Sequence, residues 1–401
     1  MQKLGFKVTF VVLTTLSGEN AHYLSSLRGA GIELLQVCDL PSARQEGRFA
    51  AKFQGGFSNF PQTTALAQTV NAIRLVSPRV IFAQLDSPNI IAAMAGLLCD
   101  VDRIVVSFRN YNPSNFDYIN NDWLLPAYRA ISSSPKVRLT GNCSGANEDY
   151  ANWIGVPKSR ISNIPNALDR DLFTAATPSQ TQHVRLELGV PEGTPVVLGV
   201  FRFSAEKGPV DFAKAAVRIA EESDAVHILV AGVGSLESEV RHHFNASAAR
   251  DRFRLLGRRE DISALMSISS LLLHAGRKEG MPNVIIEAMI SGLPVVATDA
   301  GATGELVVNG ETGFIHEIGD LDGLAKSCLR ILSQPDLASR MKEAVAFQIK
   351  DQFSPEKMAQ RYLEATGLYN LAAPDGRSSP AMGSNGVRLA SKGVSIDFAV
   401  P

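Results

Sequence analysis

The chain has 401 residues, of which 45% are apolar and 20% are charged, and its formal net charge is −1. This length exceeds one ordinary hydrophobic core, so two domains are expected. The balanced charge excludes the basic excess typical of nucleic-acid-binding proteins, so no nucleic-acid partner is expected. The cysteines lie far apart without a CxxC pair: Cys38, Cys99, Cys143 and Cys328. Their spacing favours reduced thiols in a cytoplasmic protein over a zinc site or a disulfide framework.

The N-terminal half alternates apolar runs with helical patterns. These patterns predict strands at residues 6–14, 32–37, 79–85 and 103–108 and helices at residues 22–31, 64–76 and 89–101. The run at residues 8–16 lacks a small-x-small cleavage site, which favours a first buried strand over a secretion signal. No apolar run reaches the ~20 residues that a membrane-spanning helix needs. Strands and helices that alternate along the chain are typical of a parallel sheet with helices on both faces.

The alternation stops and then restarts in the C-terminal half. Residues 165–182 contain Pro, Ser, Thr and Asn with little periodicity, which indicates a linker, and we place it at residues 166–185. Beyond it the patterns predict strands at residues 194–202, 225–232 and 293–299 and helices at residues 210–223, 282–290 and 321–333.

The predicted fold class is α/β, with two doubly wound Rossmann-like domains that face each other across an interdomain cleft. We expect the N-terminal domain at residues 1–165 and the C-terminal domain at residues 186–352. A last helix at residues 353–371 is expected to pack back toward the N-terminal domain. Residues 372–401 are rich in Gly, Ser, Pro and Ala, so we expect a disordered tail.

The stretch EGMPNVIIEAMISGLPVVATDAG, residues 279–301, places a carboxylate inside an apolar helix. Pro282 suits the first helical position, and the residues around Glu287 are apolar on every side, so the helix should be buried. A buried carboxylate is costly unless donors partner it. A salt bridge within the protein is one explanation for Glu287. A ribose diol, whose two adjacent hydroxyls donate to one carboxylate, is the other.

Glu279 stands just before this helix, where a strand turns into it. The free N–H groups of the first turn, around Asn283 and Val284, attract phosphate through their unpaired hydrogens and the helix dipole. Gly280 lets the backbone approach a ligand closely. These residues are consistent with one geometry: an anion at the helix start, a ribose beside it and a sugar against Glu279.

A second segment, GVFRFSAEKGPVDF at residues 199–212, also begins as a strand and turns into a helix. It carries Arg202 and Lys207 at the turn, where two cations suit a diphosphate whose charge grows as it leaves. The alternative is a solvated arginine and lysine on a loop. The glutamate pair two strands away favours the binding site. His274 ends a strand near Glu279 and is assigned to packing.

Five motifs in sequence order resemble those of the retaining glycosyltransferases of family four, which have the GT-B fold. Residues 279–287 resemble the E-x7-E motif, and residues 199–208 resemble the "GRLxxEKG" segment. NIPNALDRDLF resembles the family's linker, and VAGVGS and LLGRREDISALM also fall in order. The resemblance spans about residues 140–370. The motif as it stands in this chain, EGMPNVIIEA, is similar to that of family members that build bacterial surface polysaccharides.

The resemblance implies transfer of a sugar from a nucleotide-diphosphate sugar, UDP- or GDP-linked, to a hydroxyl of a saccharide or a lipid-linked saccharide. It implies retention at the anomeric carbon, and a place in bacterial polysaccharide, lipopolysaccharide or glycolipid biosynthesis. Neither a metal nor a cofactor would be needed. The enzyme would work in the cytoplasm, with peripheral contact at the inner face of the cytoplasmic membrane as an open alternative.

By position, the resemblance implies a role for each residue of the site. Glu287 would hold the ribose, Glu279 the hydroxyls of the donor sugar, and Arg202 and Lys207 the departing diphosphate. The remaining donor-binding residues would be Gly18, Gly280, Met281, Pro282, Asn283 and Val284.

The sequence departs from the family at two places in the N-terminal domain. Gly18 stands alone where members usually have paired glycines. Arg109 and Asn110 stand where many members have a histidine near the donor sugar. Arg109 could hold a phosphate or an acidic acceptor, or it could form a salt bridge, and the sequence leaves these open.

Two other readings compete with the transferase. One is a non-catalytic two-lobed sugar-binding protein, and the other is a GT-B phosphorylase or epimerase. A sugar receptor has no use for two cations on a diphosphate, so Arg202 and Lys207 together with the two glutamates favour the enzyme.

Overall fold

The computed structural model describes residues 7–13, 24–40, 62–173, 176–349, 352–367 and 394–398. The chain divides into two compact units. Unit 1 comprises Met1–Ile164 and Ala359–Pro401, and unit 2 comprises Pro165–Met358. The first division falls one residue from the boundary predicted between residues 165 and 166.

Unit 1 is built on a seven-stranded sheet in the order β2-β1-β13-β3-β4-β5-β6. Its strands are β1 (Lys7–Val12), β2 (Glu33–Gln36), β3 (Val80–Gln84), β4 (Arg103–Phe108), β5 (Val137–Gly141), β6 (Ile161–Asn163) and β13 (Val394–Phe398). Every neighbouring pair is parallel. The parallel sheet expected from the alternation of strands and helices is therefore present.

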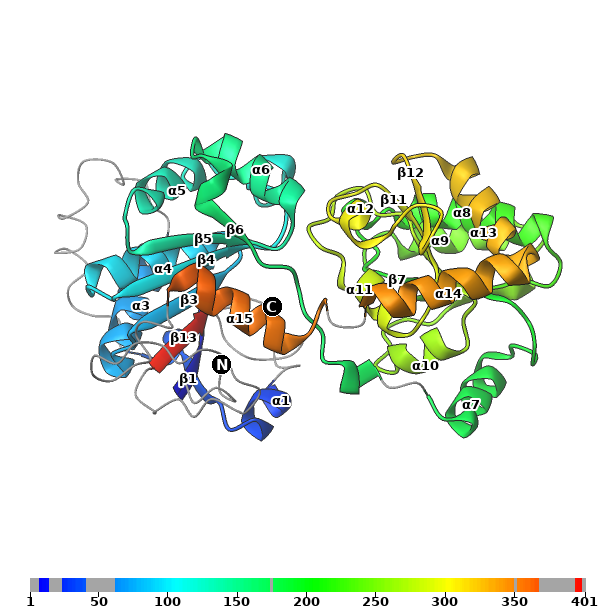
Figure 1. Ribbon diagram of the computed structural model, residues 1–401, viewed down its shortest axis with the longest axis horizontal. Coiled ribbons are helices and arrows are strands. Elements are labelled where there is room, and N and C mark those ends of the chain that lie inside the picture. Colours follow the sequence, from blue (N-terminus) through cyan, green and yellow to red (C-terminus); the bar gives the residue numbers. More distant parts are fainter. Residues whose placement is uncertain are drawn as a thin grey trace. The chain divides into compact units, whose positions relative to one another are not determined.

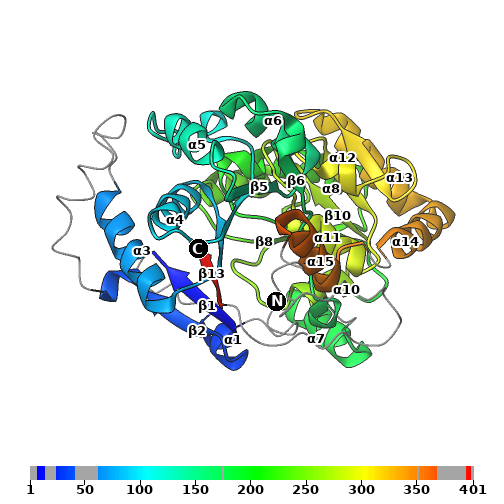
Figure 2. The same ribbon diagram turned by 60° about the vertical axis from the view of Figure 1, so that its left-hand side comes forward.

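The strand β13 corrects one prediction. Figures 1 and 2 show it in red alongside β1, and it pairs with β1 on one side and with β3 on the other. Residues 372–401 were expected to be disordered, which is wrong for Val394–Phe398. The prediction rested on the composition of the whole tail. It overlooked the short run VSIDF, in which apolar residues alternate as a strand requires. The rest of the tail lies outside the described residues.

Helices cover the sheet of unit 1. They are α1 (Leu24–Gly29), α3 (Thr63–Val76), α4 (Asp86–Leu98), α5 (Leu124–Ser132), α6 (Ser144–Ile154) and α15 (Pro355–Thr366), with short 3-10 turns at Val37–Asp39, Pro113–Asn115 and Lys158–Arg160. The core joins Ile81, Ile104 and Leu139 of the strands to α3, α4, α5 and α6. These side chains are apolar on successive strands, so the sheet and the helices bury them together.

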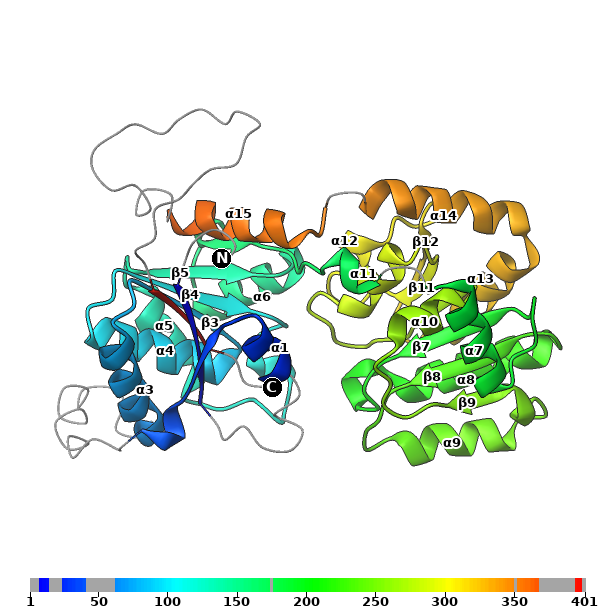
Figure 3. The ribbon, with the colours of Figure 1, turned by 90° about the horizontal axis from the view of Figure 1, so that it is seen from below.

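The last part of the helix α15, from Ala359, belongs to unit 1 (Figure 3). The ring of Tyr362 meets Phe82 of β3 edge-on, with 5.5 Å between the ring centroids. Its hydroxyl oxygen lies 3.4 Å from Ser107 Oγ of β4.

Unit 2 is built on a six-stranded sheet in the order β12-β11-β10-β7-β8-β9, again with parallel neighbours. Its strands are β7 (Val196–Val200), β8 (His227–Ala231), β9 (Phe253–Leu255), β10 (Leu271–His274), β11 (Val295–Thr298) and β12 (Gly313–His316). Figure 1 shows helices on both sides of these strands. The doubly wound arrangement predicted for this half is confirmed.

The helices of unit 2 are α7 (Pro178–Leu188), α8 (Pro209–Glu222), α9 (Glu237–Ala246), α10 (Ile262–Ser267), α11 (Asn283–Ile290), α12 (Thr303–Leu306), α13 (Leu321–Ser333) and α14 (Pro335–Ile349). Short 3-10 turns lie at Arg170–Phe173, Ala205–Lys207 and Arg250–Arg252. Within the described residues, no helix is both long and apolar enough to cross a bilayer.

The helix α7 corrects the predicted linker at residues 166–185. Thr177 accepts a hydrogen bond from the N–H of Gln180, and Gln180 accepts one from the N–H of Thr177, so the two form a capping box. Pro178 stands at the first helical position, where its missing N–H costs nothing. These start signals outweigh the weak amphipathicity that made the segment look irregular.

The order of strands in unit 2 has one switch point, between β7 and β10. From β7 the chain builds β8 and β9 on one side and then returns to place β10 on the other side of β7. In open parallel sheets, ligands bind beyond the carboxyl ends of the strands at such a point. The segments that leave β7 and β10 carry Lys207 and Glu279.

Candidate functional site

The loops after β7 and β10 are tied together by their backbones. The N–H groups of Arg277 and Lys278 both donate to the carbonyl of Glu206, at 2.9 and 3.0 Å. Gly208 has φ +61°, and a Cβ there would lie 1.9 Å from the carbonyl oxygen of Ala275. Only glycine permits this approach, which brings the start of α8 against the end of β10.

A side-chain pair supports the same junction. Arg277 donates from Nε and Nη2 to the two carboxylate oxygens of Asp211, at 2.7 and 2.9 Å. Asp211 lies in the first turn of α8 and is buried. This two-bonded geometry has a fixed direction, so it holds the loop after β10 to the helix that follows β7.

Glu279 is the most buried charged group of the junction, with 3% of its surface exposed. Lys207 Nζ lies 2.9 Å from its Oε1 and 2.7 Å from its Oε2. Burial raises the pKa of Glu279, but the hydrogen bond from His274 and the positive charge of Lys207 outweigh it, so the pKa lies below its ordinary value. Glu279 is therefore an ionised acceptor inside the protein.

His274 is part of this cluster, although the sequence had assigned it to packing. Its Nε2 lies 3.1 Å from Glu279 Oε1, and the side chain is 2% exposed. Its Nδ1 is buried without a hydrogen-bond partner among the residues described. A proton on Nε2 and a lone pair on Nδ1 satisfy this pattern best, because a buried Nδ1–H without an acceptor would be costly. The sequence signal was its position as the last residue of β10, five residues before Glu279.

Arg202 extends the positive charge of the β7 loop. Its side chain is 72% exposed, and its Nη2 lies 3.3 Å from Glu206 Oε1. Ser204 Oγ donates to the same carboxylate oxygen at 2.7 Å. The arginine of this pair is largely exposed, and Glu206 keeps the hydrogen bond from Ser204 without it, so Arg202 can exchange Glu206 for an anionic ligand at little cost.

The helix α11 starts beside Glu279 at the carboxyl end of β10. Pro282 is its N-cap rather than its first residue, and no side chain caps the helix start. Across the described structure, no hydrogen bond is recorded for the N–H groups of Asn283 and Val284. Gly301 has φ +64°, and a Cβ there would lie 2.0 Å from the carbonyl oxygen of Glu279, so the loop after β11 braces this turn.

Two residues predicted to bind the donor have partners in the protein. The Nδ2 of Asn166 donates to the carbonyl oxygen of Met281 at 3.1 Å and to Asn283 Oδ1 at 2.6 Å. The side chain of Met281 is buried, and its sulfur lies 3.2 Å from the N–H of Asn166. These contacts hold the start of α11 in place. They use the carbonyl oxygen and sulfur of Met281 and the Oδ1 of Asn283, and they leave the backbone N–H groups of both residues for a ligand.

Glu287 lies one turn into α11, on its less buried face. Ile285, Ile286, Ala288 and Met289 are buried, whereas Val284, Glu287 and Ile290 are half-buried. The expectation that the helix is buried on every side is therefore wrong, because a stripe at a spacing of three residues remains partly open.

The carboxylate of Glu287 has no hydrogen-bond or ion-pair partner in the part of the chain that the structure describes. Burial alone raises its pKa to about 7. The internal salt bridge that was one explanation for this residue is not found there. Among the described residues, the helix α11 therefore presents both a carboxylate and first-turn N–H groups that are available for hydrogen bonds to a ligand.

Arg109 belongs to unit 1 and follows the carboxyl end of β4. It is half-buried, and no ion pair or hydrogen bond of its guanidinium is recorded among the described residues. Asn142 Nδ2 lies 3.4 Å from its backbone carbonyl oxygen. Gly18 lies outside the described residues. The structure thus brings Arg202, Lys207, Glu279 and the start of α11 together in unit 2, and it places Arg109 in the other unit.

Residues 181–346 match the family model described as glycosyl transferases group 1. The match covers most of unit 2 and confirms the resemblance seen in the sequence. Among curated proteins, a UDP-Gal:alpha-D-GlcNAc-diphosphoundecaprenol alpha-1,3-galactosyltransferase of Escherichia coli is 31% identical over 180 residues, which are 44% of this chain and 46% of that protein. The N-acetyl-alpha-D-glucosaminyl L-malate synthase of Bacillus anthracis is 27% identical over 206 residues, or 51% and 53% of the two chains. The chain thus spans about half the length of these relatives.

Solved structures extend the likeness to both units. HepE of Anabaena, crystallised in complex with UDP, superposes with a TM-score of 0.72 at 19% identity, covering 89% of this chain and 98% of that one. WaaG, a glycosyltransferase involved in lipopolysaccharide biosynthesis, superposes with a TM-score of 0.62 at 16% identity, covering 90% and 100%. At these identities the likeness concerns the fold, which is the GT-B fold predicted from the sequence.

Proposed function

We propose that this chain, which matches the model of the glycosyl transferases group 1 over residues 181–346, transfers a sugar from a nucleotide-diphosphate sugar to an acceptor hydroxyl, with retention and without a metal. The observation that carries the proposal is the contact between Lys207 and the buried Glu279 at the switch point of the unit 2 sheet. A cation and an ionised acceptor held side by side suit the two chemically different parts of a nucleotide sugar.

The diphosphate would bind to donors from two loops. Lys207 Nζ has hydrogens beyond those that face Glu279, and Arg202 is exposed on the same loop. The free N–H groups at the start of α11 add the positive end of a helix dipole. These charges are fixed before the reaction, so they stabilise the diphosphate most when it leaves and its charge grows. This arrangement supplies the role that a metal has in other transferases.

The donor sugar would bind to Glu279. Its Oε1 already faces Lys207 and His274, whereas its Oε2 faces Lys207 alone. A carboxylate oxygen accepts about two hydrogen bonds, so Oε2 keeps room for one sugar hydroxyl. His274 acts here as a positioning residue, because it holds the carboxylate rather than the sugar.

The ribose would bind to Glu287. Two adjacent hydroxyls would supply the donors that this carboxylate lacks in the protein, and donation favours its ionised form. Because the pKa of Glu287 is about 7 before binding, nucleotide binding near that pH should release a proton. The size of the proton release can be measured by calorimetry in buffers of different ionisation enthalpy.

Retention would follow from attack on the face that the diphosphate leaves. The acceptor hydroxyl adds to the anomeric carbon as the bond to the diphosphate breaks, and the leaving phosphate takes the hydroxyl proton. This route needs no nucleophile from the protein. It uses Lys207 and Arg202 for the leaving group, and it does not require Glu279 to form a covalent bond.

The acceptor is proposed to be a saccharide or a lipid-linked saccharide of bacterial polysaccharide or glycolipid biosynthesis, because the relatives are named for such reactions. UDP is the first nucleotide to test, because HepE was crystallised with UDP and with UDP-glucose. We place the reaction in the cytoplasm, which the widely spaced thiols favour. Arg109 is proposed to contact the acceptor side of the reaction, since it belongs to unit 1.

The reaction can be tested before its acceptor is known, by following the slow hydrolysis of the donor by water. Proton NMR of freshly released sugar distinguishes its anomers before they equilibrate. A retaining transferase gives the anomer of the donor first, and added EDTA leaves the rate unchanged. Release of the opposite anomer, or loss of turnover in EDTA, would contradict retention or metal independence. Turnover that requires inorganic phosphate, or conversion of the sugar while it stays on the nucleotide, would favour a phosphorylase or an epimerase.

A further inference from the structure

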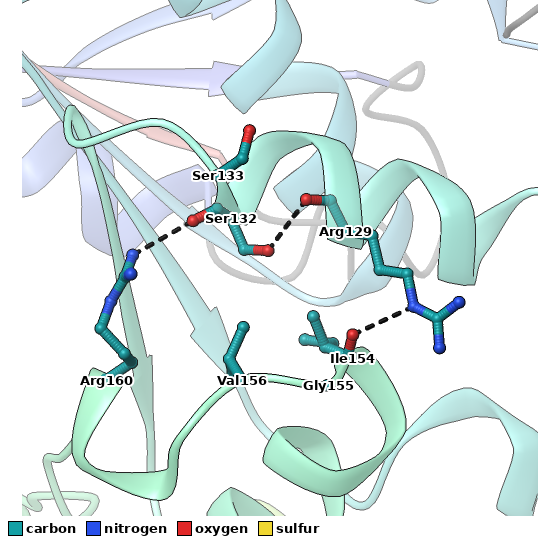
Figure 4. Close-up of a pocket in the computed structure, with 7 residues that line it drawn as sticks. All are labelled: Arg129, Ser132, Ser133, Ile154, Gly155, Val156 and Arg160. Atoms are coloured by element: carbon teal, nitrogen blue, oxygen red, sulfur yellow. Dashed lines mark hydrogen bonds between the residues drawn. The ribbon is translucent and has the colours of Figure 1, made fainter.

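Unit 1 contains a pocket at the edge of its sheet opposite to Arg109. Its volume is about 540 Å³, and it is lined by Arg129, Ser132, Ser133, Ile154, Gly155, Val156 and Arg160 (Figure 4). The helices α5 and α6 end there, and Arg160 immediately precedes β6, so the pocket lies at the amino ends of β5 and β6. Arg109 follows the carboxyl end of β4, the length of a strand away.

Each of the two arginines of the pocket donates a hydrogen bond to a backbone carbonyl of the protein. Arg129 Nε donates to the carbonyl oxygen of Ile154 at 3.0 Å, and Arg160 Nη2 donates to that of Ser132 at 3.1 Å. Each bond satisfies a carbonyl at the end of a helix. A helix end carries about half a negative charge, whereas a guanidinium carries a full positive charge and five N–H groups. Both arginines therefore keep charge and donors in excess.

Neither arginine has a carboxylate partner in the described part of unit 1. Nearby basic groups do: Lys136 lies 2.6 Å from Asp100, and Lys158 lies 2.9 Å from Glu148. The pocket is thus flanked by two positive charges without counter-ions. Figure 4 shows Arg129 and Arg160 on opposite sides of it, with Ser132 and Val156 between them.

Two further arginines strengthen the positive field beside Arg160. Burial, then the charges of Arg103 and Arg160, place the pKa of Arg138 below its ordinary value. Arg103 Nε is buried and has no hydrogen-bond partner among the described residues. Like charges this close destabilise one another unless an anion lies among them.

We propose that this pocket binds a phosphate-bearing ligand between Arg129 and Arg160. Guanidinium groups match the geometry of phosphate oxygens, and they are weakly hydrated, so they bind phosphate at modest cost. The volume exceeds that of a phosphate group, and Ile154 and Val156 provide an apolar wall for the carbon part of the ligand. The site lies in unit 1, so it is distinct from the donor site of unit 2 and does not depend on the transfer reaction.

The phosphate could belong to a lipid headgroup or to a soluble phosphate ester, and two probes distinguish these sources. Calorimetry with glycerol 3-phosphate tests the soluble ester. Co-sedimentation with phosphatidylcholine vesicles, with and without phosphatidylglycerol, tests the headgroup. The full chain is compared with Arg129→Gln/Arg160→Gln. The control Arg218→Gln/Arg241→Gln removes the same charge from two exposed arginines, paired with Asp322 and Glu237.

Binding of either probe should weaken about tenfold or more in Arg129→Gln/Arg160→Gln and stay unchanged in the control. If the Gln variant does not fold, Arg129→Lys/Arg160→Lys keeps the charge and removes the guanidinium forks, and the same weakening is expected. Binding of glycerol 3-phosphate identifies a soluble ester, and binding of phosphatidylglycerol vesicles alone identifies a headgroup. The proposal is overturned if neither probe binds, or if the pocket variants bind as well as the control.

Discussion

Lys207 Nζ lies 2.9 and 2.7 Å from the two carboxylate oxygens of Glu279, although 72 residues separate them in the sequence. The contact joins the loop after β7 to the loop after β10. It therefore fixes the relative positions of a cation and an ionised acceptor before any ligand arrives. The burial of Glu279 also links function to stability, because the removal of Lys207 would leave the charge of this carboxylate inside the protein.

Lys207→Met should destabilise unit 2 strongly. The carboxylate of Glu279 would stay buried with only His274 as a partner, which costs about 3–5 kcal/mol in the free energy of unfolding. The matched control is Arg241→Met, whose partner Glu237 is solvent-accessible, and it should cost less than about 1 kcal/mol. Urea unfolding measures both. Equal and small losses would show that the buried pair is not held as described.

Glu287 should make the stability of the protein fall with rising pH. Burial raises its folded-state pKa from 4.5 to about 7, so the folded state binds more protons than the unfolded state between these values. The contribution is complete below the unfolded pKa and is lost as the pH rises through about 7. It amounts to at most about 3 kcal/mol.

The variant Glu287→Gln should remove this pH dependence. Urea unfolding at about pH 5 and about pH 8 gives the difference in unfolding free energy between the two proteins. The contributions of the other titrating groups cancel in this difference. We expect the variant to be more stable than the original chain at the higher pH. If the two proteins differ in unfolding free energy by the same amount at both pH values, a hydrogen-bond donor must keep the pKa of Glu287 at its ordinary value.

Gly208→Ala should disturb the junction between the two loops. The new Cβ would meet the carbonyl oxygen of Ala275 at 1.9 Å, so either the loop moves or the helix α8 shifts. Gly257→Ala is a suitable control, because Gly257 has a similar φ of +64° and nothing within 4 Å of the added carbon. Both pay the strain of a left-handed conformation, and the clash should cost Gly208→Ala about 2 kcal/mol more. Similar thermal unfolding of the two variants would contradict the close approach.

Arg109→Gln should separate transfer from nucleotide binding. Because Arg109 is proposed to contact the acceptor and not the nucleotide, the affinity for a nucleoside diphosphate should stay unchanged. Transfer to an acceptor should fall at least about tenfold, with the stability unaltered, since the guanidinium has no recorded partner among the described residues. Calorimetry and a turnover assay measure the two properties. Loss of nucleotide affinity would place Arg109 in the donor site instead.

The parts of the fold and site that were predictable are local in the sequence. Apolar runs and helical spacing identify β7, β10 and their neighbours, and parallel strands align their carboxyl ends, so Lys207 and Glu279 were expected at one edge. The start of α11 was predicted to within one residue, because Pro282 and the apolar run after it are strong signals.

What the sequence did not predict depends on contacts between distant residues. The pairing of Arg277 with Asp211 and the bond from His274 to Glu279 need the folded sheet to bring them together. The strand β13 is five residues long within a tail of disorder-like composition, and it is specified by the strands on either side of it. The arginines of the unit 1 pocket come from separate elements, and what distinguishes them is that neither has a carboxylate partner among the described residues.

The most direct test is thermal stabilisation of the purified chain and of Glu287→Gln by UDP, GDP, ADP, CMP, their sugar conjugates, NAD and free sugars. We expect a rise in melting temperature with one nucleoside diphosphate and its sugar conjugate, and a much smaller rise in Glu287→Gln. A rise with free sugars or NAD only, or an equal rise in both proteins, would contradict the claim that α11 and its carboxylate bind a nucleotide sugar.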